Sequence, residues 1–288
     1  LKIKEGLYLN GQYAANYYTR DTKKYVPAMN RWMSDGTEDP GNKLRKNSIS
    51  ESHINTLTQT LNATATYQKN INLHDFKLLG GFSQEWAHTN TLSAGRKVLL
   101  LDGIEVIDAG TDEITNGGSA EEWALRSFFG RINYNYDEKY LLEANVRYDG
   151  TSRFAKDNRW GCFPSFSAGW NFSKEKFMSF ADPVLQMAKL RASWGELGNQ
   201  NVGDNFYPYL VAIESVDKAY PIGNQLNTGF QQIALGNKNI KWETIRMLNI
   251  GVDFTLFNNR LTVSADWFKK NNMDALVRPS FPLVIGKW

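Results

Sequence analysis

Cysteine is nearly absent from this 288-residue chain, which contains only Cys162. A single cysteine rules out an intrachain disulfide and any thiolate metal cluster. The sequence also lacks a run of about 18 apolar residues, so no transmembrane helix is expected. An excess of one charge is missing as well, since 33 Lys and Arg stand against 30 Asp and Glu. This balance gives no electrostatic reason to expect nucleic acid as a partner.

Sequence signatures of catalysis are also missing. No Gly-x-Ser-x-Gly elbow and no strand-to-helix phosphate loop occurs, and the three histidines, His53, His74 and His88, show no metal-ligand spacing. We therefore expect no enzymatic activity, no metal and no cofactor.

One segment is rich in acidic residues and raises the question of a calcium site. Their spacing is not that of an EF-hand, so a solvated acidic loop is the preferred interpretation. The residues are Asp102, Asp108, Asp112 and Glu113.

The dominant pattern is an alternation of apolar and polar residues with a period of two, which is typical of strands whose two faces meet different surroundings. Even-numbered residues from Tyr140 to Tyr148 are apolar or aromatic, and their odd-numbered neighbours are mostly polar. Residues 128–136 alternate in the same way, and the polar turn at 137–139 predicts a hairpin. Further alternating segments are 57–67, 165–172, 189–195, 248–256 and 261–267.

About nine strands are predicted, several of them long enough for the roughly 9–11 residues that a tilted transmembrane strand needs. Short connections alternate with long ones, as in outer-membrane barrels, where short turns lie on one side and long loops on the other. The short connections are expected near 69–73, 137–139, 173–187 (with a short helix at 175–180) and 257–260, and the long loops near 19–53, 89–122, 149–161 and 196–243. The mean hydropathy of −0.47 agrees with this prediction, because only every second residue of such a strand faces lipid. The fold class is therefore an all-β, transmembrane, antiparallel up-and-down β-barrel.

The two faces of these strands predict two environments. A charge on the lipid face costs roughly 2–4 kcal/mol at the bilayer midplane. Glu143, Arg147, Arg191 and Asp253 are therefore expected to face a wet lumen, where cross-strand ion pairs or contacts with a plug are preferred over substrate contact.

Aromatic residues make up 13% of the chain, a proportion that suits a membrane interface or a sugar-binding surface. Those in the predicted loops are candidates for contact with substrate, and packing between loops or onto a partner is the preferred alternative for each of them. The candidates are Tyr25, Trp32, Trp160, Tyr207, Tyr209, Tyr220 and Trp242.

Three blocks resemble a known family, the SusC/RagA-type TonB-dependent transporters of Bacteroidetes. The first block is RYDGTSRF (147–154) followed by WGCFPSFSAGW (160–170), and the second is LRASWGELGNQNVG (190–203) followed by YPY (207–209). The third is GNKNIKWET (236–244) followed by LFNNRL (256–261). Cys162 replaces an aromatic residue usual in the family, and Lys238 replaces a proline. The first 125 residues resemble the family only in their general pattern and contain none of these blocks.

The resemblance implies an outer-membrane importer of oligosaccharides or peptides in a Gram-negative bacterium, energised by the TonB complex through an N-terminal region that is missing here. It also implies a SusD-like surface lipoprotein as partner and contact with outer-membrane lipid. Residues 1–288 would then form a partial barrel, with a plug domain before them and the closure of a 22-stranded barrel after them. Two other hypotheses are a soluble or surface-anchored glycan-binding β-protein without transport activity, and an outer-membrane barrel enzyme.

Overall fold

The computed structural model describes residues 2–29, 32–37, 46–101, 103–181, 184–203, 206–223 and 225–276. The chain divides into two compact units. The first comprises Leu1–Tyr13, Thr60–Glu85 and Trp123–Trp288, and the second Ala14–Gln59 and Trp86–Glu122.

Strands dominate the described residues, as the alternating pattern predicts. Twelve strands are present there, against the nine or so expected. They are β1 (Lys2–Lys4), β2 (Leu7–Val26), β3 (Ser48–Ile71), β4 (His74–Leu99), β5 (Gly110–Tyr136), β6 (Tyr140–Thr151), β7 (Trp160–Asn171), β8 (Leu185–Asn199), β9 (Ala212–Ile222), β10 (Gln225–Ala234), β11 (Glu243–Leu256) and β12 (Leu261–Met273).

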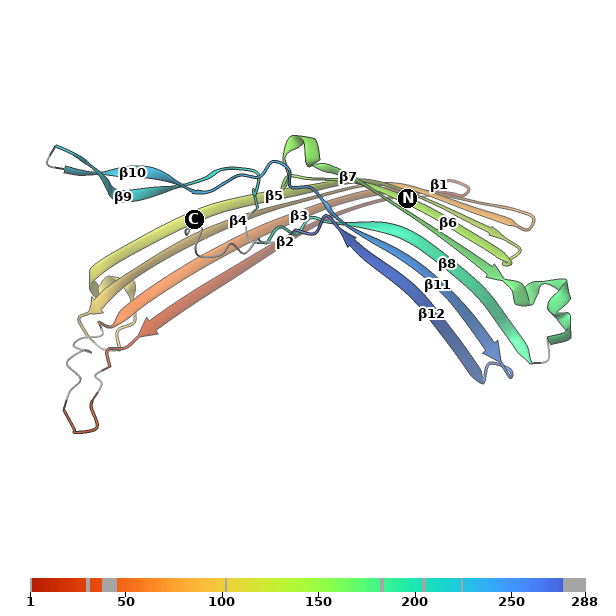
Figure 1. The fold of residues 1–288 in the computed structure, drawn as a ribbon, viewed down its shortest axis with the longest axis horizontal. Helices are drawn as coiled ribbons and strands as arrows, with labels where there is room; N and C mark the ends of the chain where they lie inside the picture. The colour runs from red at the N-terminus through yellow and green to blue at the C-terminus, as the bar shows by residue number, and fades with distance from the viewer. Residues whose placement is uncertain are drawn as a thin grey trace, which may run out of the picture. The chain divides into compact units, whose positions relative to one another are not determined.

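Ten of these strands form one sheet in the order β1-β2-β3-β4-β5-β6-β7-β8-β11-β12, and β9 and β10 pair separately (Figure 1). Strand order therefore follows chain order, apart from the β9–β10 hairpin inserted between β8 and β11. The pairs from β5 to β8 and from β8 through β11 to β12 are antiparallel. This is the meander expected of an up-and-down barrel wall, and within the described residues it ends at β1 and β12 without closing.

Tight turns set the register of the hairpins in the first unit. Tyr136 pairs with Tyr140, and the intervening Asp137 and Glu138 have positive φ values of 48° and 52°. Positive φ at both central residues is the type I′ geometry, whose twist matches that of the flanking strands. The predicted hairpin at 128–148 is thereby confirmed.

Two of the predicted long loops are shorter than expected. Strand β2 extends to Val26 and β3 begins at Ser48, so both ends of 19–53 are strand; β4 and β5 are separated only by residues 100–109, so most of 89–122 is strand. The loop predicted at 196–243 contains the β9–β10 hairpin. In β5, residues 111–122 are all exposed, so both faces meet solvent and the sequence carries no alternation.

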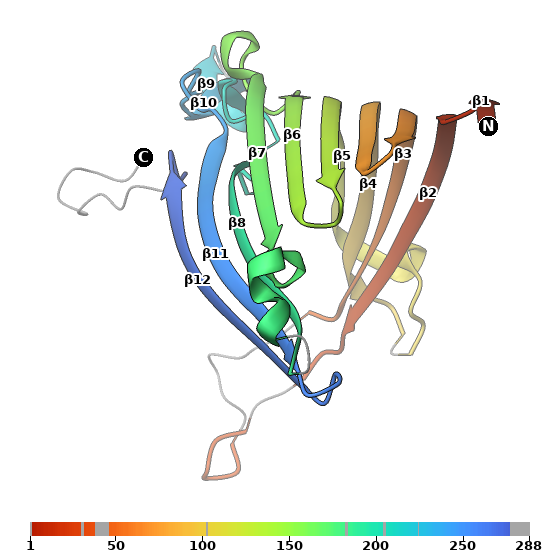
Figure 2. The same ribbon diagram turned by 90° about the vertical axis from the view of Figure 1, so that its right-hand side faces the viewer.

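The connection between β7 and β8 contains two 3₁₀ segments, η4 (Phe172–Lys174) and η5 (Lys176–Ala181), where a short helix was predicted at 175–180. Figure 2 shows these 3₁₀ segments at the end of β7. None of the helices in the described ranges has the length and apolarity needed to cross a bilayer.

Candidate functional site

In the first unit, the strand register separates polar from apolar side chains. Glu143 of β6 lies opposite Asn133 of β5 and Ser167 of β7, and Arg191 of β8 lies opposite Gly251 of β11. We call the side of the sheet that carries these residues the polar face. The four residues predicted to face the lumen, Glu143, Arg147, Arg191 and Asp253, all belong to it.

The opposite side of the same strands is the apolar face. It carries a shallow groove whose exposed lining is largely apolar. Its lining includes Phe76, Ile132, Leu142, Ala144, Phe166, Ala168, Ala192, Trp194 and Leu248.

Aromatic pairs lie at both ends of the apolar face. At the turn end, the rings of Tyr136 and Tyr140 stack 6.2 Å apart, and at the loop end Tyr148 stacks on Trp160 at 4.8 Å. Tyr140 and Tyr148 are eight residues apart, which corresponds to roughly 26 Å along the strand. Because the strands of a membrane barrel tilt by about 35–45°, this length corresponds to a band about 20 Å tall, close to the apolar band of roughly 25 Å that lies between aromatic girdles on the outer surface of such barrels.

The turn-end girdle is tied to the connection that follows β7. Glu175 accepts hydrogen bonds from the Tyr140 hydroxyl (2.6 Å) and from Trp170 Nε1 (3.1 Å). These bonds stabilise the carboxylate and lower the pKa of Glu175 below its usual value.

A charged cluster crosses three strands on the polar face. Arg191 Nε donates to Asp253 Oδ2 at 2.9 Å, and Arg191 Nη1 lies 2.7 Å from Asp266 Oδ1. Ser264 donates to Asp253 and accepts a bond from Arg191. The planar guanidinium therefore links β8, β11 and β12, which is a use that lysine cannot reproduce.

A second polar cluster joins β5 and β6. Glu143 accepts bonds from Asn133 Nδ2 (2.5 Å) and Asn145 Nδ2 (2.8 Å), and Asn145 Oδ1 accepts one from Arg131 Nε (2.7 Å). Arg147, farther along β6, pairs with Asp149 at 3.2 Å. The polar face is thus a hydrogen-bonded surface rather than a row of isolated charges.

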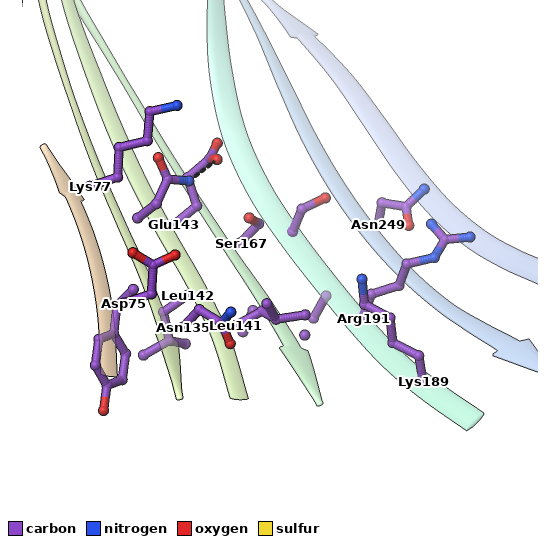
Figure 3. Close-up of a pocket in the computed structure, with 16 residues that line it drawn as sticks. Asp75, Lys77, Asn135, Leu141, Leu142, Glu143, Ser167, Lys189, Arg191 and Asn249 are labelled. Atoms are coloured by element: carbon purple, nitrogen blue, oxygen red, sulfur yellow. Dashed lines mark hydrogen bonds between the residues drawn. The ribbon is translucent and has the colours of Figure 1, made fainter. Parts of the chain in front are cut away.

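Two hollows of about 440 and 580 Å³ run along the polar face and share Glu143, Ser167 and Ser193. In Figure 3, Lys77 and Glu143 lie on one side of the first hollow, and Lys189 and Arg191 lie on the other. Together the hollows form one wide, water-accessible trough with charges of both signs. Such a surface suits the passage or docking of a polar molecule better than the catalysis of a reaction.

Glycines shape the loop end of this trough. A Cβ on Gly161 or Gly198 would overlap the ring of Phe163, and one on Gly81 would overlap the ring of Phe129. The two phenyl rings occupy space that only glycine leaves free.

A small core lies at the base of the loops. The rings of Phe154 and Phe163 pack edge-on against Trp242, at centroid distances of 5.5 and 5.3 Å. Trp242 is only 7% exposed, and its Nε1 donates to the carbonyl of Arg159 at 3.0 Å. Asn158 adds a second bond, to the carbonyl of Lys238. These contacts join the β6–β7 connection to the β10–β11 connection.

The structure scatters the seven aromatic candidates for substrate contact. Tyr207 and Tyr209 contact each other, with ring centroids 6.5 Å apart, whereas Trp242 packs loops together. Trp160 is the first residue of β7 and lies in the apolar face rather than in a loop. In the second unit, Tyr25 lies in β2 and Trp32 is 66% exposed. The side chain of Tyr220 lies outside the described residues.

Sequence reasoning missed two members of the polar face, Ser264 and Asp266. Their signal was present, because both alternate with apolar residues in 261–267. Their link to Arg191 was not visible, since it depends on the pairing of β8 with β11.

The acidic segment of the second unit is paired with cations. Asp108 lies 3.0 Å from Arg96, Asp112 lies 2.5 Å from Lys46, and Glu113 pairs with Lys97. Asp102 lies outside the described residues. Among those that are described, no three His, Cys, Asp or Glu side chains are grouped to hold a metal ion.

Comparison with known proteins identifies the family. The model of the family "TonB dependent receptor-like, beta-barrel" matches residues 4–283. The chain is 34% identical over 229 residues to the TonB-dependent receptor SusC of Bacteroides thetaiotaomicron, covering 77% of this chain and 22% of that protein. It is 32% identical over 223 residues to the TonB-dependent receptor P3 of Formosa agariphila, with the same two coverages. The chain therefore spans about a fifth of the length of these relatives.

Solved structures agree on the fold. The RagAB peptide transporter matches with a TM-score of 0.83 and 23% identity, over 99% of this chain and 30% of that one. A closed state of the RagAB peptide importer gives a TM-score of 0.84 at 22% identity, with the same coverage. The resemblance to SusC/RagA-type proteins and the all-β barrel class are confirmed: the chain belongs to the TonB-dependent receptor β-barrel family and forms part of the wall of an outer-membrane barrel.

Proposed function

We propose that the protein to which this chain belongs is an energy-coupled importer of oligosaccharides or peptides across the outer membrane. The observation that carries the proposal is the two-sided sheet. One face is a hydrogen-bonded, charged trough, and the other is an apolar band with aromatic ends. A wall of this kind separates a wet passage from lipid, and its family membership favours transport over catalysis.

In this proposal the polar face lines the lumen. Arg191 pairs with both Asp253 and Asp266, and the Asn133–Glu143–Asn145 cluster keeps its carboxylate hydrogen-bonded. Paired charges bind water and polar ligands without holding them tightly, which suits passage. In this proposal Tyr207 and Tyr209, whose rings pack edge to face in the connection after β8, contact a sugar ring or a peptide.

The proposed partners are a SusD-like surface lipoprotein and the TonB complex, the latter acting through a part of the protein outside residues 1–288. The relatives supply the support. SusC is a TonB-dependent receptor, and RagAB is described as a peptide transporter.

The test is gentle detergent extraction of the full-length protein from outer membranes, followed by mass spectrometry of everything that co-purifies. A stoichiometric SusD-like lipoprotein, with bound glycan or peptide, supports the importer. Recovery in a detergent-free soluble fraction without a lipoprotein would overturn it and favour the glycan-binding module.

A further inference from the structure

On the apolar face, the apolar residues of β8, β11 and β12 are followed directly by charged residues toward the loop end of each strand. From the turn end, the outward residues of β12 run apolar from Leu261 to Trp267, and the next is Lys269. Those of β11 run apolar from Leu256 to Leu248, and the next is Arg246. The two strands therefore leave their apolar stretch at nearly the same level.

Arg246 is held in place there. Its Nε and Nη2 lie 2.8 and 2.5 Å from Glu196 Oε1, and its guanidinium lies 5.9 Å from the ring centroid of Trp194. An arginine fixed over an aromatic ring at the edge of an apolar surface keeps its charge at a defined depth.

Lys269 lies beside this cluster. Arg246 pairs with Asn271, and Leu248 pairs with Lys269, so Arg246 and Lys269 occupy diagonal positions on neighbouring strands, where long side chains are within reach of each other. Lys269 has no ion-pair partner among the residues that the structure describes. Because Glu196 neutralises one of the two cations, the cluster has a net charge of +1.

Position and charge together identify the ligand chemistry. Trp194 and Trp267 mark the level of the membrane interface, where indole rings concentrate. Cations directly beyond that level meet lipid headgroups, and a positive site there attracts anionic ones. The apolar stretch below offers acyl chains a continuous surface.

We propose that Lys269 and Arg246 form a binding site for the phosphate headgroup of an anionic lipid of the outer leaflet. Lys269 supplies the uncompensated charge, Arg246 supplies the remaining guanidinium donors, and Asn271 lies opposite Arg246 with an amide donor. The proposal rests on the orientation described above, in which the apolar face meets lipid.

The test uses the full-length protein in detergent and native mass spectrometry. The protein is titrated with bisphosphorylated lipid A and, separately, with the same lipid lacking its phosphates, and the two affinities are compared. Lys269→Gln should weaken binding of the phosphorylated lipid about fivefold, since one cation is lost near the membrane surface. Lys269→Arg should bind like the wild type, and so should Lys189→Gln, which removes a lysine from the polar face of β8.

The outcomes separate the two proposals. Equal binding of phosphorylated and phosphate-free lipid, or unchanged binding by Lys269→Gln, refutes the headgroup site. If the lipoprotein co-purifies in the same preparation, the importer stands despite that failure. A loss confined to Lys189→Gln would mean that the polar face meets lipid, and it would overturn both the site and the orientation.

Discussion

Replacing Ala144 with arginine tests which face of the sheet meets the membrane. Ala144 lies on the apolar face of β6, opposite Ile132 of β5 and Phe166 of β7. It is four residues from Tyr140 and four from Tyr148, or about 13 Å along the strand from each aromatic girdle. No other position on β6 is more central to the apolar band.

The expected cost follows from that depth. An arginine on the lipid face at the midplane of a barrel costs about 2–4 kcal/mol, which changes the folding equilibrium by about 30-fold to nearly 1,000-fold. The matched control is Ser167→Arg, which adds the same side chain to a small residue of β7 on the polar face. Ser167 lies opposite Glu143, so the new cation meets a carboxylate and a wet trough. Its cost should stay within about 0.5 kcal/mol.

The assay is urea titration of the full-length protein folded into lipid vesicles, with the folded fraction measured by the gel mobility of unheated samples. Ala144→Arg should lower the urea midpoint clearly, and Ser167→Arg should not. A larger loss for Ser167→Arg, or equal stability of both variants, would refute the assignment of the two faces.

Two further predictions use the same titration, and a third uses an acid titration followed by fluorescence. Trp242→Phe should cost about 1 kcal/mol for the lost indole hydrogen bond, and Trp242→Ala about 3–5 kcal/mol; equal costs would contradict the packing. Arg191→Met should destabilise less than Trp242→Ala, because the cluster is partly exposed, and converting its two carboxylates to amides should restore part of the loss. Hydrogen bonds from Tyr140 and Trp170 lower the pKa of Glu175, so its carboxylate stabilises the folded protein fully above about pH 4.5 and loses this effect as the pH falls. The loss should be accompanied by a change in Trp170 fluorescence at acid pH, and Glu175→Gln should abolish that change.

The sequence was most informative where a strand lies between lipid and water. Residues 128–148 alternate without a break, and the hairpin forms there with the turn at 137–139. The same contrast between faces predicted that Glu143, Arg147, Arg191 and Asp253 face a wet lumen, and the register places all four on one side of the sheet. A period of two is visible only when the two surroundings differ.

The alternation of apolar and polar residues disappears where both faces of a strand have the same surroundings. The exposed residues 111–122 of β5 are strand, yet Thr, Asn, Ser and Gly are acceptable to solvent on either face. The β9–β10 hairpin was missed for the same reason. Trp242 was a substrate candidate because it stood in a predicted loop, and its burial depends on Phe154, a residue 88 positions earlier. Contacts between loops leave no periodic trace in the sequence.

The glycines under Phe129 and Phe163 determine how closely these two rings can approach the sheet. A phenyl group that lies down over Gly81, or over Gly161 and Gly198, adds apolar cover to the wall without projecting from it. An alanine at any of these sites would bring its methyl group within 2.1–2.5 Å of a ring carbon, so the ring would have to shift, and a shift of Phe163 would disturb its packing on Trp242. Three missing methyl groups thus let two phenyl rings lie close against the sheet, and at Phe163 they let the core at the base of the loops pack directly onto it.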